Sequence, residues 1–229
     1  MQRLVVLVFV GFAAVASAME KPCINYKPPA SDDGEDRPVA TAITVGPQGS
    51  DYALKVEFDK APWGEACGSR CANTTIFLDT DNNKTTGLKL NDPKAAENGA
   101  DLAITVQGNR DYKESSAVAT LKIKVKQFSE DATSLESGIQ LVELDSRQDE
   151  DRISVNEKVV YLLIDANIGS LPSGPKIRVV YHPPDAKPLS GFAKGLSAAG
   201  ANRVEIFKQG KLTNPTAKKK KKNPEDEDP

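Results

Sequence analysis

Oxygen-bearing side chains alternate in a short polar segment at residues 79–83, with the sequence DTDNN, directly after an apolar, β-branched run. Alternate side chains in a tight loop can converge on one point, and Ca²⁺ binds about 6–8 oxygen ligands at ~2.3–2.6 Å. Asp79, Asp81 and Asn83 supply two carboxylates and an amide, and backbone carbonyls and water can add further oxygens. The segment therefore predicts a Ca²⁺ site, with Asp101 at the start of the following predicted strand as a more distant ligand.

This segment does not fit an EF-hand. An EF-hand loop has glycine at its sixth position and glutamate at its twelfth, where this chain has Lys84 and Leu90, and it lies between two helices. An alternative for the same residues is an Asx-rich turn, in which Asp and Asn side chains accept hydrogen bonds from their own backbone. The spacing leaves both interpretations open.

The residues that nucleophilic catalysis needs are scarce. A Ser-His-Asp site would have to use His182, the single histidine, and no G-x-S-x-G elbow accompanies it. The sequence also contains no G-x-x-x-x-G-K-[ST] or G-x-G-x-x-G phosphate-binding loop. We therefore expect a non-catalytic protein. A glycoside hydrolase with an unidentified carboxylate pair is an alternative, because a sequence does not give the distance between two carboxylates.

Three cysteines are present: Cys23, Cys67 and Cys71. A structural zinc site needs four Cys or His ligands, and the chain has only these three and the distant His182. Disulfides persist in oxidising compartments. We therefore expect a structural disulfide between Cys67 and Cys71, which would close a small loop, although the sequence is equally compatible with the other two pairings.

The elements that must position these residues are β-strands. Alternation of period 2 is clearest at Leu121, Ile123 and Val125, which are separated by lysines. Similar β-prone runs recur between Gly- and Pro-rich breaks, at residues 39–45, 52–58, 74–78, 100–106, 117–126, 138–144, 152–155, 158–164, 176–181 and 203–207. This pattern predicts an all-β fold, an antiparallel β-sandwich of about nine or ten strands. The domain is expected over residues 39–210, with an extended lead-in at 19–38 and a loop or one weak helix at 190–201.

Residues 74–106 carry a longer pattern, an apolar strand followed by D-T-D-x-x-x-x-T-G and, after a loop, by G-A-D before another strand. The residues that form it are Asp79, Thr80, Asp81, Thr86, Gly87, Gly99, Ala100 and Asp101. The pattern resembles the family 9 carbohydrate-binding-module-like (DOMON-related) domains of bacterial extracellular proteins. Residues 155–181 are similar to a later feature of that family, so the resemblance covers roughly residues 39–185. It implies a sandwich fold, often with a structural Ca²⁺ near Asp79, Asp81 and Asp101.

Sugar-binding members of this family stack sugars on exposed aromatic rings. The chain has one tryptophan, Trp63, and aromatic residues make up 6% of it. A carbohydrate-binding module that uses Trp63 and a tyrosine such as Tyr52 as its stacking platform is therefore an alternative function.

The two ends of the chain have distinct compositions. Residues 1–18 combine Arg3, an apolar run and a final Ala-Ser-Ala, which is typical of a cleavable signal peptide and predicts a secreted or periplasmic location. No later stretch is apolar enough to span a membrane. Residues 211–229 contain a block of five lysines, Lys218–Lys222, followed by four acidic residues, and are expected to be a disordered, solubilising tail, with a polybasic anchor for an acidic surface or polysaccharide as the alternative. The net charge of −2 gives no long-range attraction to nucleic acid, and we expect a polysaccharide or an envelope or matrix component as the partner.

Overall fold

The computed structural model describes residues 21–29, 37–63, 71–113, 116–164, 174–184, 186–195 and 206–207, with only the backbone given for residues 110–113 and 116–118. The predicted signal peptide at 1–18 and the predicted tail at 211–229 lie outside these residues, and both stay predictions. Within them the chain forms eleven strands and no helix, which confirms the all-β class.

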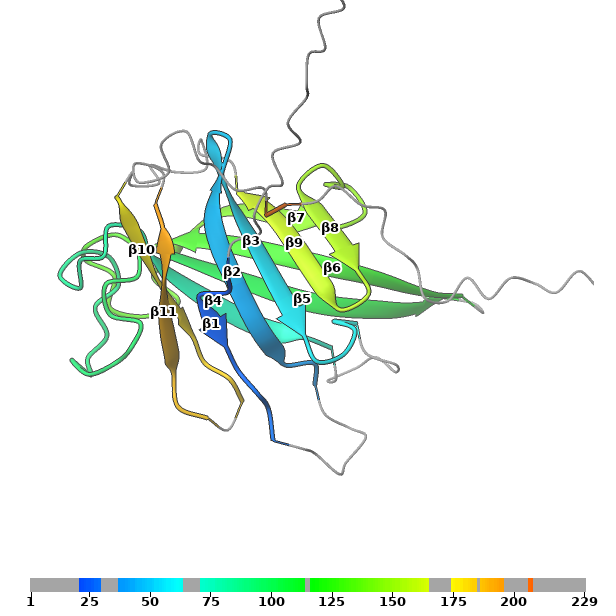
Figure 1. Ribbon diagram of the computed structural model, residues 1–229, viewed down its shortest axis with the longest axis horizontal. Helices are drawn as coiled ribbons and strands as arrows, with labels where there is room; N and C mark the ends of the chain where they lie inside the picture. Colours follow the sequence, from blue (N-terminus) through cyan, green and yellow to red (C-terminus); the bar gives the residue numbers. More distant parts are fainter. Residues whose placement is uncertain are drawn as a thin grey trace, which may run out of the picture.

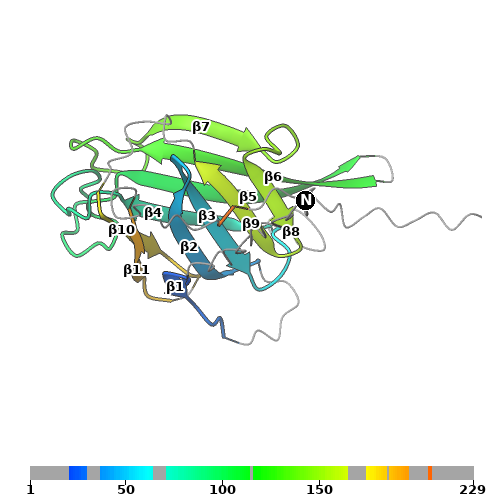
Figure 2. The same ribbon diagram turned by 45° about the horizontal axis from the view of Figure 1, so that its top comes forward.

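The strands form two antiparallel sheets that pack face to face, and Figure 1 shows the first sheet in front of the second. The first sheet has five strands in the spatial order β1 (Ile24–Asn25), β2 (Ala40–Gln48), β3 (Asp51–Phe58), β9 (Val159–Ile164) and β8 (Ile153–Asn156). The second has six strands in the order β11 (Leu189–Lys194), β10 (Lys176–Tyr181), β4 (Asn73–Asp79), β5 (Leu102–Lys113), β6 (Ser116–Gln127) and β7 (Ile139–Asp145). Figure 2 shows the same two layers from a second direction. The structure is thus the β-sandwich that the sequence predicts.

Alternation along the strands builds the core between the sheets. In the first sheet Leu54 lies opposite Leu162, and in the second Val106 lies opposite Ile123; all four side chains are buried in one cluster. The residues between them point to the outer faces, because successive side chains of a strand alternate in direction. Burial of these apolar side chains is the main contribution to the stability of such a fold.

Two strands, β1 and β11, were not predicted. They lie beside each other at one edge of the sandwich (Figure 1). β1 lies in the predicted lead-in and pairs Ile24 with Ile43 of β2. β11 lies where a loop or weak helix was predicted, so that prediction is wrong for residues 190–194. Its Gly191 lies against the backbone of Cys23, where an added Cβ would be 1.8 Å from the carbonyl oxygen. A close approach of this kind depends on a distant segment, which the local composition of β11 does not reveal.

A short segment near the C-terminus covers part of the outer face of the first sheet. Ile206 and Phe207 pack with Ala53 and Tyr161 in a small buried cluster. The Gln48 Oε1 accepts hydrogen bonds from both backbone amides, at 2.8 Å from Ile206 N and 2.5 Å from Phe207 N. One side chain at the end of β2 thus satisfies two partly buried donors of a segment about 158 residues away in sequence.

Replacement of Gln48 by Ala should destabilise the protein by about 1–3 kcal/mol, because it leaves two partly buried N–H groups without their acceptor. Gln48→Glu keeps an acceptor oxygen and should retain most of the stability. The measurement is chemical denaturation, with Ser50→Ala, an exposed change in the adjacent turn, as the control. Equal stability of Gln48→Ala and Ser50→Ala would contradict this role.

Candidate metal centre

The sheet topology brings the predicted acidic residues together. Asp79 is the last residue of β4, and Asp101 directly precedes β5. Because β4 and β5 are antiparallel neighbours with Leu78 opposite Leu102, the exit of one strand and the entry of the next lie at the same end of the sheet. Carboxylate oxygens of Asp79, Asp81 and Asp101 all lie within 4.8 Å of one another. The convergence that the sequence analysis required is therefore present in the structure.

The connection between β4 and β5 folds back over the outer face of the second sheet. It places Leu88 and Ala100 in a second buried cluster with Phe77 and Val180 of the sheet. Leu88 N donates to Ala100 O at 2.8 Å, and Gly99 N donates to Leu88 O at 2.8 Å. These contacts hold the two ends of the connection against each other and so fix Asp101 relative to Asp79.

Two glycines permit this close packing. Gly87 has a φ of 62°, and an added Cβ there would lie 2.3 Å from the carbonyl oxygen of Ala100. Gly99 has a φ of 88°, and an added Cβ would lie 2.5 Å from the Cα of Lys84. Both positions combine the left-handed region, which favours glycine, with a lack of space for any side chain. These are the glycines of the T-G and G-A-D parts of the sequence pattern.

The Asx-turn interpretation also describes this loop correctly. Asp81 Oδ1 accepts from the backbone of Asn83 at 2.9 Å, and Asn83 Oδ1 accepts from the backbone of Thr85 at 3.1 Å. Thr86 Oγ1 donates to Asp81 Oδ2 at 3.0 Å. The two interpretations are therefore compatible, because the turns direct Asp81 towards the other two carboxylates while its oxygens retain lone pairs for a cation.

Asn83 contributes to the loop chiefly through its backbone. Its N–H lies 3.0 Å from Asp79 Oδ1 as well as 2.9 Å from Asp81 Oδ1. Its side-chain oxygen accepts from both the backbone and the hydroxyl of Thr85, at 3.1 and 2.8 Å. A role for Asn83 as a metal ligand stays a prediction, and in this structure its amide oxygen serves the turn.

Arg178 is the residue of the site that the sequence analysis missed. It lies on β10 directly opposite Asp79, and its Nε donates to Asp79 Oδ2 at 2.9 Å. The other two guanidinium nitrogens donate to the backbone carbonyls of Ala96 and Asn98 in the connection. The side chains of both ion-pair partners are almost fully buried, with exposed fractions of 6% for Arg178 and 1% for Asp79. A charged residue within the apolar run of β10 was the available signal, since such residues are rarely buried without a partner.

Burial is the main influence on the pKa values of Asp79 and Asp101. It raises the pKa of Asp101 above its ordinary value, against the hydrogen bonds that Thr80 donates from its N and Oγ1 at 2.7 and 2.6 Å. The negative charge of Asp81 raises the pKa of Asp101 further. Burial likewise raises the pKa of Asp79, although the ion pair with Arg178 opposes this effect. With three carboxylates and one buried guanidinium, the site holds more negative charge than Arg178 neutralises, and a bound cation would relieve that cost.

The donor set fits a hard divalent cation. Three carboxylates in a half-buried loop match the oxygen ligands of Ca²⁺, and the loop carbonyls and water can complete the coordination. The same set lacks the nitrogen and sulfur ligands that structural zinc sites use. The residues present thus fit the predicted Ca²⁺. The ion would neutralise their charge and fasten the connection between β4 and β5.

The predicted sugar-stacking platform is contradicted by the structure. Trp63 and Tyr52 each have an exposed fraction of 2% and belong to the main core between the sheets. A sugar cannot stack on a ring that is packed on all sides by apolar neighbours. Aromatic residues fill a core as readily as they form a binding platform, so residue type did not distinguish the two roles.

The other candidate residues have separate places. Cys67 lies outside the described residues, so its predicted disulfide with Cys71 stays a prediction, and Cys23 is a thiol that donates to Ile43 O at 3.1 Å. His182, directly after β10, has its Nε2 at 2.8 Å from Glu97 Oε1 and its ring edge-on to Phe77. This pairing gives His182 a role in holding the connection between β4 and β5.

No protein-family model matches the chain, and neither the curated proteins nor the solved structures include a significant match. The resemblance in residues 74–106 therefore stays a prediction, and the metal centre rests on its geometry. In the part of the chain that the structure describes, no helix is long and apolar enough to cross a membrane.

Removal of the Arg178 guanidinium should destabilise the metal-free protein by about 3–5 kcal/mol, because Arg178→Met leaves the buried Asp79 carboxylate without its counter-charge. Asp79→Asn in the Arg178→Met background should restore part of this loss, since the uncompensated charge is then gone. Chemical denaturation in EDTA of both single variants and the double variant measures the coupling. Additive effects of the two substitutions would show that the pair is not coupled.

The raised pKa of Asp101 predicts a pH-dependent effect of its isosteric replacement. A carboxyl with a raised pKa in the folded state favours folding most below the ordinary carboxyl pKa of about 3.9, and this contribution is lost as pH rises through the raised value. In EDTA, Asp101→Asn should therefore gain stability relative to the parent between about pH 4 and pH 7. Asp131→Asn, an exposed change, should show no such trend. The measurement is denaturation over that pH range, and a relative loss with rising pH would contradict the electrostatic account.

Proposed function

We propose that this protein is an exported, calcium-stabilised β-sandwich that acts as a non-catalytic binding or structural module of the cell envelope or extracellular matrix. The observation that carries the proposal is the convergence of Asp79, Asp81 and Asp101 within 4.8 Å at one end of the second sheet. This geometry supports a cation that fastens two strands and their connection.

The position of the site favours a structural ion. Asp79 is almost fully buried, and Arg178 and Thr80 already hold Asp79 and Asp101 in fixed positions. A catalytic ion needs an open coordination position in a substrate cleft, whereas these carboxylates belong to the two ends of a connection whose Leu88 and Ala100 pack on the sheet. The ion would stabilise the folded chain by mass action, by about 2.7 kcal/mol when its concentration is a hundred times the dissociation constant.

Export is supported by the sequence of residues 1–18 and by the resemblance to extracellular modules. It also suits the site, because extracellular calcium modules work with weak dissociation constants of about 10⁻⁴–10⁻³ M, which Ca²⁺ outside cells can saturate. A structural ion of this kind would therefore be bound after export. The three parts of the proposal, namely location, cation and non-catalytic role, are thus mutually consistent.

Calcium should raise the melting temperature, and EDTA should lower it reversibly. Stabilisation of about 2.7 kcal/mol corresponds to a shift of roughly 5–10 °C for a domain of this size. Thermal unfolding of the purified protein in EDTA, in excess Ca²⁺ and in excess Mg²⁺ measures the effect, with Ca²⁺ expected to exceed Mg²⁺ because Mg²⁺ demands stricter octahedral geometry.

The acidic residues of the site provide the matched controls. Asp79→Asn, Asp81→Asn and Asp101→Asn should each abolish most of the calcium-dependent shift, while Asp131→Asn on an exposed loop should leave it unchanged. Asp101→Asn is the most informative variant, because it should be tolerated in EDTA yet fail to gain stability from Ca²⁺. Identical melting of the parent protein in EDTA and in Ca²⁺ would refute the proposal of a calcium-stabilised module.

A further inference from the structure

A groove of about 670 Å³ opens at the edge of the sandwich where β11 lies beside the segment that leads into β1. Its described walls include three lysines and an aromatic ring, together with two prolines: Lys21, Lys176, Lys194, Phe192, Pro22 and Pro175. None of the described residues that line the groove is acidic. The groove is therefore a local concentration of positive charge in a chain whose net charge is −2.

Two of these lysines stand in an unfavourable arrangement. Lys176 of β10 and Lys194 of β11 are directly opposite each other in the antiparallel pair, and both are exposed. Like charges at directly opposed positions destabilise a sheet. Lys21, from a different segment, adds a third ammonium group to the same groove. An anion bound between these groups would convert the repulsion into attraction.

An exposed aromatic side chain borders the lysines. Phe192 has an exposed fraction of 50%, and the Nζ of Lys176 lies 3.7 Å from the centre of its ring. The ring thus holds one ammonium group in place by a cation–π contact, while half of its surface remains available to a ligand. Anionic groups and an apolar face can therefore be recognised together at this position.

We propose that this groove binds a segment of an acidic polysaccharide, with sugar carboxylates or sulfates at Lys21, Lys176 and Lys194 and a sugar face against Phe192. The inference rests on the proposed function and names the ligand class of that binding module. The volume lies within the range of about 300–1,000 Å³ that is usual for small-ligand sites, which suits a few sugar units. A membrane surface is flat and does not match a concave groove of this kind.

The groove borders the metal centre. Gly174 lies so close to the loop that an added Cβ would be 2.6 Å from Thr80 O and 3.3 Å from the Cα of Asp81. The next residue, Pro175, lines the groove, and its carbonyl accepts from Gly195 N at 3.0 Å. The loop with the carboxylates thus supports one wall of the groove, so binding must be measured with Ca²⁺ at saturation.

The test compares three dextrans that share one backbone: dextran sulfate, carboxymethyl dextran and uncharged dextran. The protein is the full chain in which the five tail lysines, Lys218–Lys222, are replaced by Gln, so that the tail does not add its own attraction for anions. We expect both charged dextrans to bind and the uncharged one not to bind. Lys21→Gln, Lys176→Gln and Lys194→Gln should each weaken binding about two- to fivefold, as for single exposed ion pairs.

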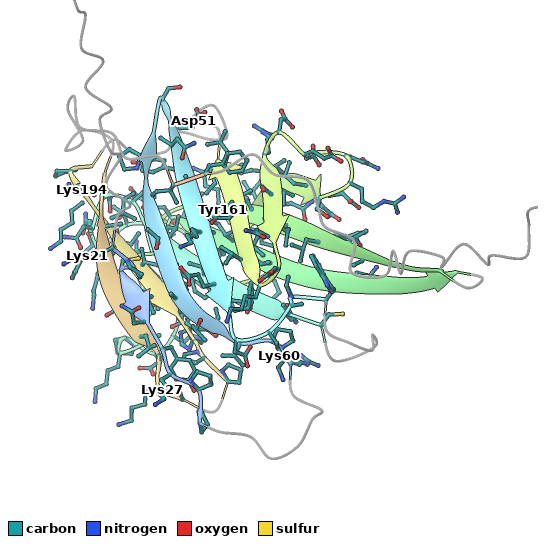
Figure 3. All side chains as sticks on the ribbon, turned by 45° about the vertical axis from the view of Figure 1, so that its right-hand side comes forward. Lys21, Lys27, Asp51, Lys60, Tyr161 and Lys194 are labelled. Carbon is teal, nitrogen blue, oxygen red and sulfur yellow. The ribbon has the colours of Figure 1, made fainter. Side chains whose placement is uncertain are left out.

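Lys27→Gln is the matched control. It removes the same charge from an exposed lysine of the same N-terminal segment, and Figure 3 shows Lys27 farther along the edge than Lys21 and Lys194. It should leave binding unchanged. Because Lys194→Gln removes a repulsive pair, it should also melt at the same temperature as the parent or higher, which separates lost binding from lost folding.

The sugar part of the inference has its own control. Phe192→Leu should weaken the binding of charged dextran about two- to tenfold, the range for a lost aromatic contact, and should weaken the binding of polyphosphate, an anion without sugar rings, less. Equal effects of Lys27→Gln and Lys194→Gln, binding of uncharged dextran, or tighter binding to phosphatidylglycerol vesicles than to charged dextran would each overturn the inference. A calcium-dependent melt without binding of charged dextran would overturn the groove alone and leave the proposed function standing.

Discussion

Three carboxylates within 4.8 Å of one another impose the main electrostatic constraint on this fold. Burial raises the pKa values of Asp79 and Asp101, and the negative charge of Asp81 raises the pKa of Asp101 further. The chain offsets only part of this cost, through the Arg178 guanidinium and the hydrogen bonds that Thr80 and Asn83 donate. A bound divalent cation would supply the remaining compensation and would so link three side chains to the stability of the whole sandwich.

This constraint extends from the site through the connection between β4 and β5. The connection covers Phe77 and Val180 on the outer face of the second sheet, and it supplies the backbone carbonyls that Arg178 binds. Anything that loosens the carboxylates therefore loosens a hydrophobic cluster as well. Gly87 and Gly99 permit this packing, because no side chain fits at either position.

The sequence predicted the parts of this arrangement that depend on local patterns. Alternation identified the core strands, and the D-x-D spacing with a later G-A-D identified the three carboxylates. Residues whose role depends on distant partners were missed or misassigned. Arg178 lies in a run that reads as an apolar strand, and only the register of β10 against β4 places it opposite Asp79. Trp63 and Tyr52 are of the residue types that form sugar-stacking platforms, but their burial depends on how the two sheets pack.

The contrast between Arg178 and Lys176 connects the two sites. These residues are two positions apart on β10, so their side chains leave the same face of the sheet. Arg178 is covered by the connection and neutralised by Asp79, whereas Lys176 lies beyond that cover, exposed and opposite another lysine. Arg178 thus has an acidic cross-strand partner, Asp79, whereas the cross-strand partner of Lys176 on β11 is another lysine. The two sites thus have opposite requirements: the three carboxylates carry more negative charge than Arg178 neutralises and would be satisfied by a cation, whereas the lysines of the groove would be satisfied by an anion.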